Sequence, residues 1–306
     1  MLLAMLSCTA FAEDRTIYFV TALDGGPCLG PCQEGFEQAC EELGYTAKWV
    51  CPVTACDTPQ MVELCENALT AGADAIVCIA LEDEPYSDVF TRAKEKGLAV
   101  VTVNTTISQD YTDAWIGTEP VGMGKTQAQA LMNAFTPDQE INLVYMQSTI
   151  TATTQNVQFD TVVSELEANG YTVNVKNGWH CESKTDSTLA ADLITALRKA
   201  NPEINAVCLV DGYAPAAIAS YIEENNVDDL VVVSVDDSVE CMNAVKNGVL
   251  TCTVIQDFRQ MGYQSVYLCK DILDGNEFVY DNDSGAHILY AEDIDAHAAE
   301  IGVALD

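Results

Sequence analysis

The sequence is poor in positive charge. It holds 13 Lys plus Arg against 47 Asp plus Glu, which gives a formal net charge of -34 at pH 7. Such a chain repels phosphate backbones, so we expect no nucleic-acid partner. The acidic residues are spread without long runs, a pattern typical of a solvated surface. Beyond the first dozen residues no stretch approaches the ~20 apolar residues of a membrane-spanning helix, which argues against a membrane span.

Histidine is scarce as well. The chain has three, His180, His287 and His297, and none has a cysteine, serine or acid at a spacing typical of a catalytic or metal site. We therefore predict a binding protein and not an enzyme, with no cofactor and no metal. Turnover of any substrate would restore the enzyme as an alternative.

Cysteine, in contrast, is abundant, with 13 residues. Cys28 and Cys32 follow the first predicted strand, and Cys51 and Cys56 follow the second. If the two strands are neighbours, these loops meet at the rim of the sheet, and we hypothesise one disulfide between them. The short spacings of these pairs do not match a zinc site. Most other cysteines fall on apolar faces and read as small core residues.

The first twelve residues, MLLAMLSCTAFA, are apolar and small and end in a signal-peptidase-like Ala10-Phe11-Ala12. We expect residues 1–12 to be a signal peptide and the mature protein to be periplasmic or otherwise extracytoplasmic. The segment lacks a basic region, so the true start of the signal stays open. A lipid anchor on Cys8 is the alternative, although Met5-Leu6-Ser7 before it makes a weak lipobox.

Apolar runs and amphipathic stretches alternate along the chain, which is the rhythm of parallel α/β sheets. Strands are predicted at 16–23, 46–51, 74–80, 98–103, 113–117, 141–146, 171–176, 205–210, 230–235 and 250–255. Helices are predicted at 29–43, 58–71, 86–96, 120–135, 155–169, 186–200, 213–225, 238–246 and 258–273. Glycines that suit left-handed helix ends follow four of them, namely Gly44, Gly97, Gly170 and Gly248.

The pattern restarts after Gly117, so we predict two similar doubly wound α/β lobes of five or six strands each. No Pro/Gly/Ser-rich linker occurs, which favours short crossings between the lobes and not a tether. The most informative segment lies between Val231 and Gln256. It reads VVVSVDDSVECMNAVKNGVLTCTVIQ, in which two successive strands end on polar residues. Because ligands bind at the carboxyl ends of such strands, this segment predicts a binding crevice.

Several stretches together resemble the type I periplasmic solute-binding proteins of ABC transporters, in the branch of ribose-, galactose- and autoinducer-2-binding proteins. They are TIYFVTALDGGPCLGPCQEGFEQACEELGY, GADAIVCIALEDE, GLAVVTVN, AWIGTEPVGMGK and VVVSVDDSVECMNAVKNGVLTCTVIQDFRQMGYQSV. The resemblance implies two lobes joined by three hinge crossings near Thr118, Asp257 and Ser284. The N-terminal lobe would be 14–117 plus 257–283, and the C-terminal lobe 118–256 plus 284–306.

The resemblance also implies the site. One small solute would be enclosed between the lobes by hinge closure and passed to a membrane permease, and we expect a monomer. The ligand-binding positions carried over are Asp236, Gln256, Trp179, Asp211, Asn104, Thr105, Gln155, Gly26 and Cys28. The family has an asparagine and aromatics where Gly26, Cys28 and Leu29 stand here. It has an Asp-Arg pair at Asn104 and Thr105. These departures break the correspondence with any single member.

The residue types favour a neutral, sugar-like ligand. A carboxylate accepts bonds from vicinal hydroxyls, amides donate and accept, and the indole of Trp179 would cover the C–H face of a ring. A cationic or other non-sugar ligand is the alternative, with Asp211, Asp236, Glu82 and Glu119 around an ammonium group. A chemoreceptor-type ligand sensor stays open, and a repressor-like ligand-sensing core is a further alternative on the same fold.

Overall fold

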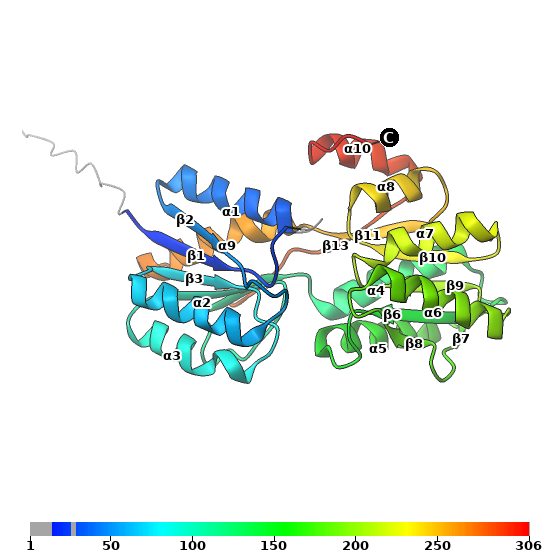
Figure 1. Ribbon diagram of the computed structural model, residues 1–306, viewed down its shortest axis with the longest axis horizontal. Coiled ribbons are helices and arrows are strands. Elements are labelled where there is room, and N and C mark those ends of the chain that lie inside the picture. The colour runs from blue at the N-terminus through cyan, green and yellow to red at the C-terminus, as the bar shows by residue number, and fades with distance from the viewer. Residues whose placement is uncertain (1–13, 26–28, 306) are drawn as a thin grey trace, which may run out of the picture. The chain divides into compact units, whose positions relative to one another are not determined.

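The computed structural model of the chain describes residues 14–25 and 29–305. In it the chain forms two compact units, shown in Figure 1. Unit 1 contains Pro31–Ile116, Arg259–Asn282 and the described residues up to Asp24. Unit 2 contains Gly117–Phe258 and the described residues from Asp283. Beyond residue 30 the chain therefore changes unit after Ile116, Phe258 and Asn282, next to the positions where the resemblance places the crossings.

Unit 1 is built on a sheet that has six strands in the described part of the chain, in the order β12-β5-β4-β3-β1-β2. The strands are β1 (Thr16–Val20), β2 (Thr46–Val50), β3 (Ala75–Cys78), β4 (Ala99–Val103), β5 (Ala114–Gly117) and β12 (Asp281–Asp283). The helices are α1 (Leu29–Leu43), α2 (Thr58–Ala71), η1 (Glu84–Tyr86), α3 (Ser87–Glu95) and α9 (Phe258–Asp274). The strands from β2 to β5 run parallel.

Both faces of this sheet are covered, which explains why every residue of β3, β4 and β5 is buried. Figure 1 shows α1 and α9 on one side of the strands and α2 and α3 on the other. The apolar stripe of α1 packs inward through Cys32, Phe36 and Ala39, all fully buried.

Two glycines let α1 and α9 approach each other closely. A Cβ on Gly35 would lie 2.1 Å from the carbonyl oxygen of Arg259, and a Cβ on Gly262 would lie 2.0 Å from that of Cys32. Because no side chain fits at either place, the two backbones pack directly against each other.

Unit 2 repeats this design on a sheet with seven strands among the described residues, in the order β13-β11-β10-β9-β6-β7, with β8 also paired to β6. The strands are β6 (Glu140–Gln147), β7 (Thr172–Asn174), β8 (His180–Glu182), β9 (Ala206–Leu209), β10 (Val231–Val235), β11 (Cys252–Gln256) and β13 (Ala286–Leu289). The helices are α4 (Pro120–Ala134), α5 (Thr153–Ala168), α6 (Ser187–Ala200), α7 (Ala214–Asn225), α8 (Val239–Lys246) and α10 (Ala291–Glu300). All pairs are parallel except β11 with β13.

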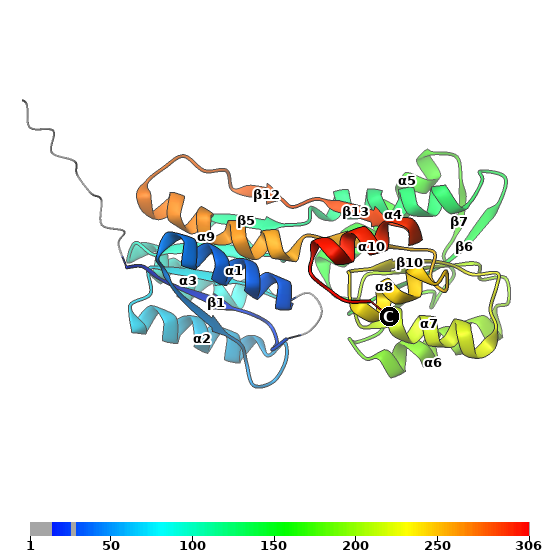
Figure 2. The ribbon, with the colours of Figure 1, turned by 90° about the horizontal axis from the view of Figure 1, so that it is seen from above.

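Each face of the second sheet has its own core. One cluster joins the sheet to α6, α7, α8 and α10, and the other joins it to α4 and α5. Figure 2 shows α4 and α5 on one side of the strands and α6 and α7 on the other. The sheet interior is thus sealed, and polar side chains of the strands emerge where the strands end.

The predicted α/β class with two doubly wound sheets is confirmed. The four predicted helix-ending glycines, Gly44, Gly97, Gly170 and Gly248, all have positive φ, between 71° and 84°. The sequence prediction missed β8, β12, β13 and α10. The three-residue strands are too short to show a period of two. In α10, only Ile294 and Ala298 are buried along ten residues, which leaves a weak helical stripe.

Candidate functional site

Polar side chains gather at the carboxyl ends of β6, β9, β10 and β11 in unit 2. Gln147 ends β6, Asp211 follows β9, Asp236 follows β10 and Gln256 ends β11. The strands that carry them are almost entirely buried, so the polar groups come together only at this edge. In a sheet of this topology, the carboxyl edge is where ligands bind.

Asp236 sits at the centre of this edge. Its φ is +63°, in the left-handed region that Asp tolerates better than most residues. Its amide N–H donates to the carbonyl of Val254 over 3.0 Å, and its carbonyl accepts from the hydroxyl of Thr253 over 2.7 Å. These bonds on both sides of the residue hold the unusual backbone and aim the carboxylate away from the strand.

The carboxylate of Asp236 is 7% exposed and accepts a hydrogen bond from Nε2 of Gln256 over 3.1 Å. It also lies against the turn that follows β9, since a Cβ on Gly212 would be 2.7 Å from its Oδ2. Because Gly212 has no side chain, the carboxylate has space at this position. The predicted partners Asp236 and Gln256 are brought together.

Asp211 lies on the other side of Gly212 and is 4% exposed. Its Oδ1 accepts from the amide of Tyr213 over 3.0 Å, and its Oδ2 accepts from the hydroxyl of Ser183. Both donors are neutral groups, a backbone amide and a hydroxyl. The structure thus places Asp211 next to Gly212, which the Asp236 carboxylate approaches, and adds Ser183. Sequence reasoning did not find Ser183 because it follows the unpredicted strand β8.

Gln155 is the fourth predicted polar residue here, and its side chain hydrogen-bonds to other parts of unit 2. Its Oε1 accepts from the amide and the hydroxyl of Ser148, at 3.0 and 2.9 Å. Its Nε2 donates to the carbonyl of Val210 over 3.4 Å. Gln155 therefore ties the ends of β6 and β9 together, so at least its carbonyl oxygen is already committed.

A buried network that was not predicted lies next to Gln155. The side chain of Gln147 is fully buried and donates from Nε2 to the carbonyl of Thr149 and to Oδ1 of Asn156, at 2.6 and 3.1 Å. Its Oε1 lies 2.6 Å from Nε2 of His180. Because that amide oxygen only accepts, the Nε2 of His180 carries the proton.

His180 is also stacked on Phe159, with ring centroids 4.0 Å apart. Burial lowers the pKa of His180 below its ordinary value, while the Coulombic field of Asp160 opposes this shift. Burial thus favours the neutral form of the ring, whose Nε2–H orients the amide of Gln147.

Trp179 is a correction to the sequence prediction. Its side chain is 1% exposed and belongs to the core cluster beside α6 and α7. Its carbonyl accepts from the amide of Tyr145, two residues before the end of β6, so it lies below the edge where the carboxylates gather. An indole buried in this core, on the turn before β8, offers no face to a ligand.

Unit 1 carries the predicted residues Asn104 and Thr105 at the end of β4. Asn104 has φ +63° and donates its amide to the carbonyl of Ile116 over 2.8 Å. The hydroxyl of Thr105 donates to the carbonyl of Ala80 over 2.5 Å, which joins the ends of β4 and β3. The other two predicted residues of this unit, Gly26 and Cys28, lie outside the described residues, as do Cys8 and the predicted signal peptide.

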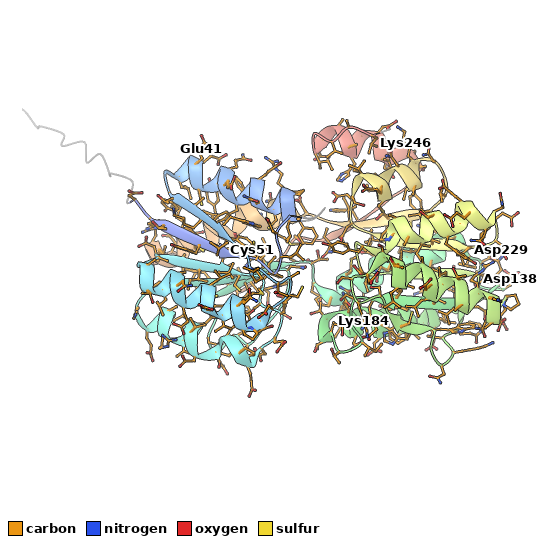
Figure 3. The ribbon with its side chains drawn as sticks, viewed as in Figure 1. Glu41, Cys51, Asp138, Lys184, Asp229 and Lys246 are labelled. Carbon is orange, nitrogen blue, oxygen red and sulfur yellow. The ribbon has the colours of Figure 1, made fainter. Side chains whose placement is uncertain are left out.

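Cys32 lies on the inner face of α1, within the predicted helix 29–43, and is fully buried against α9. This burial takes Cys32 out of the loops that the hypothesised bridge would join. The described cysteines are all free thiols, and Cys51 and Cys56 follow β2, where Figure 3 labels Cys51. A bridge from either of these to Cys28 stays a hypothesis, because Cys28 is not among the described residues.

Glu119, one of the acids expected around a cationic ligand, has a structural role. Its side chain accepts from the amides of Val121 and Gly122, at 3.1 and 2.6 Å, and so caps α4. Within residues 14–25 and 29–305, no cluster of three or more histidines, cysteines and acids is placed to hold a metal ion. In the same residues no helix is both long and apolar enough to cross a bilayer.

Comparison with known proteins places this geometry in context. A family model described as "Periplasmic binding protein domain" matches residues 17–277. GanP, a glucose-galactose binding protein from Geobacillus stearothermophilus, has a TM-score of 0.82 at 19% identity, covering 92% of this chain and 99% of that one.

Two further solved structures are similar to this chain. A solute-binding protein of an ABC transporter from Burkholderia graminis, in complex with D-arabinose, gives a TM-score of 0.84 at 18% identity over 93% and 98% of the two chains. One from Bacillus halodurans with bound myo-inositol gives 0.82 at 19% identity over 95% and 100%. At such identities the likeness shows the fold.

Proposed function

The chain belongs to the periplasmic binding protein family, and on that premise we propose that it is the solute-binding receptor of an ABC importer for a small neutral sugar or sugar-like molecule. The family predicted from the sequence is thereby confirmed. Its ribose, galactose and autoinducer-2 branch stays a prediction.

The observation that carries the proposal is the setting of Asp236. This carboxylate is almost fully buried at the carboxyl edge of unit 2, fixed by Gln256 and set against Gly212, with Asp211 beyond. A fixed carboxylate acceptor suits hydroxyl donors, and the carboxamide of Gln256 has a further acceptor and donor for the same ligand. The bound D-arabinose and myo-inositol of two similar proteins are ligands of this kind.

Thermal-shift measurements with D-glucose, D-galactose, D-arabinose and myo-inositol test this. A ligand at 100 times its dissociation constant adds about 2.7 kcal/mol to the stability of the protein, a clear upward shift. We expect Asp236→Asn to keep the fold and the bond from Gln256 but to weaken binding by about one to two orders of magnitude, because a charged acceptor is lost.

Asp228→Asn is the matched control, since it removes the same charge from an exposed site outside this edge. A sugar that shifts the wild type and both variants equally would remove Asp236 from the site. Failure of every neutral compound would overturn the proposed ligand class.

A cationic ligand is the second candidate. Two carboxylates, Asp211 and Asp236, share this edge, and the net charge of -34 attracts cations. Spermidine is the probe for this reading. A shift with spermidine at physiological salt, and none with the sugars, would establish it.

Membership of the family implies an extracytoplasmic location. We propose that the membrane partner is the permease of the importer, with the chain acting as a monomer. A chemoreceptor is the competing partner. Uptake of the labelled ligand by cells with and without the gene separates the two, because a sensor alone leaves uptake unchanged.

A further inference from the structure

Directly after Asp236, the side chain of Asp237 is held by a histidine from the C-terminal helix. Nε2 of His297, on α10, lies 3.0 Å from Oδ2 of Asp237. Both side chains are only 13% exposed, so water screens the pair little. The family resemblance did not point to His297.

The turn from Asp236 to Ser238 is fixed at each of its three residues. The carbonyl of Asp236 accepts from Thr253, and the hydroxyl of Ser238 caps α8 by accepting from the amide of Cys241 over 3.2 Å. Between them, Asp237 bonds to His297. A non-glycine residue at positive φ persists only where its surroundings hold it, and His297 supplies a contact from α10.

The helix that carries His297 is anchored without the help of this pair. Ile294 and Ala298 of α10 are buried in the core of unit 2. Asp295 of α10 also pairs with Lys246 of α8 over 3.1 Å, and Figure 3 labels Lys246 beside α10. Loss of the imidazole should therefore leave α10 in place.

We propose that His297 is a positioning residue for the ligand site. Its bond to Asp237 holds the turn so that the carboxylate of Asp236 stays against Gly212 and Gln256, ready to accept from the ligand. This inference rests on the proposed function in one respect, namely that the ligand binds to Asp236.

The proposal predicts a pH dependence of the site. The groups facing His297 are mostly acidic: Asp237 on the turn, Glu300 on its own helix and Asp257 after β11, with the Lys246–Asp295 pair between the helices. The hydrogen bond to Asp237 is the largest influence and raises the pKa of His297, against an opposing effect of burial. Affinity should therefore be highest while His297 is charged and fall as pH rises through its raised pKa.

Hydrogen exchange of the ligand-free protein tests the positioning step without any ligand. In His297→Ala, amides of the segment from Asp236 to Cys241 should exchange about tenfold faster, whereas those of α10 should stay protected. His297→Gln should restore protection, because its amide still donates to Asp237. Asp295→Asn is the matched control, since it breaks the ion pair that joins α10 to α8 and leaves the bond from α10 to the turn intact. Equal effects of His297→Ala and Asp295→Asn, or no change in either, would overturn the proposal.

Calorimetry with the neutral sugar that shifts the wild type, taken from the four compounds above, tests the consequence for binding. Between about pH 6 and about pH 9 the wild type and Asp295→Asn should lose affinity, whereas His297→Gln should show a flat profile. A wild-type profile as flat as that of His297→Gln would refute the role of the charge. If no sugar binds, the proposed function fails, and the exchange measurement still decides on His297.

Discussion

Asn104 and Asp236 occupy the same position in the two units. Asn104 directly follows β4 and Asp236 directly follows β10, each has φ +63°, and each donates its amide to a carbonyl of the next strand, Ile116 or Val254. The sheets around them share one strand order, β2-β1-β3-β4-β5 in unit 1 and β7-β6-β9-β10-β11 in unit 2. The chain thus uses one turn twice, with an amide in one unit and a carboxylate in the other.

The shared turn predicts the response of Asn104 to substitution. Alanine should destabilise unit 1 by about 1 kcal/mol, because the left-handed region costs an ordinary residue 1–2 kcal/mol. Glycine has no such cost and should stay within about 0.5 kcal/mol of the wild type. Urea unfolding of Asn104→Ala and Asn104→Gly measures the difference, and a less stable glycine variant would contradict this account.

Gly212→Ala should weaken ligand binding without unfolding the protein. The new methyl group would meet Oδ2 of Asp236 at 2.7 Å, so the carboxylate has to move. We expect a loss of at least about tenfold in affinity by calorimetry. Gly122→Ala is the control, since its nearest neighbour, Oε2 of Glu119, would be 3.4 Å away, an ordinary contact. Similar affinity of the two variants would show that Asp236 does not depend on this space.

Gly262→Ala should destabilise unit 1. Its Cβ would lie 2.0 Å from the carbonyl of Cys32, and that backbone can give way only if α1 and α9 separate. Overpacking of this kind costs typically 1–3 kcal/mol, more than the gain of about 0.5–1 kcal/mol from replacing a helical glycine. Urea unfolding checks this prediction, again against Gly122→Ala, and equal stability of the two variants would refute the close contact.

The histidines His180 and His297 should titrate on opposite sides of the ordinary value of 6.5. The pKa of His297 is raised, so its contribution to stability is complete below about pH 6.5 and is lost as pH rises through its folded pKa. The pKa of His180 is lowered, so its contribution is complete above about pH 6.5 and is lost as pH falls through its folded pKa.

Proton NMR of the imidazoles, assigned with His180→Gln and His297→Gln, measures both pKa values directly. Asp237→Asn should bring the pKa of His297 back toward 6.5 and leave that of His180 unchanged. Two histidines that titrate together would contradict both assignments.

The fold could be predicted because its sequence signals are local and repeated. Buried strands, amphipathic helices and glycine helix ends follow one another in register, and Asp236 stands out because it follows a strand of four valines and one serine. The site was harder, because it depends on contacts between distant segments. Ser183, which contacts Asp211, directly follows a strand of only three residues, and His297 contacts Asp237 across 60 positions of sequence.

Trp179 shows how a sequence prediction of a site residue fails. A tryptophan between two short strands is the residue type expected to stack on a ligand ring. Whether it faces the core or the rim depends on how β8 pairs with β6, and three residues, HCE, do not encode that pairing. Gln155 is a similar case. Its residue type suggests a ligand contact, but its side chain joins the ends of two strands through Ser148 and Val210.

The close approach of α1 and α9 has a consequence for biosynthesis. Since α9 lies more than 200 positions after α1, the ribosome must translate β6 through β11 before the N-terminal half can receive its last helix. Until then the surface of α1 around Gly35, which α9 covers in the folded protein, is exposed and can contact other apolar segments. Nascent chains of this protein should therefore need a chaperone, or should fold late, whereas a domain made of one continuous segment would need neither.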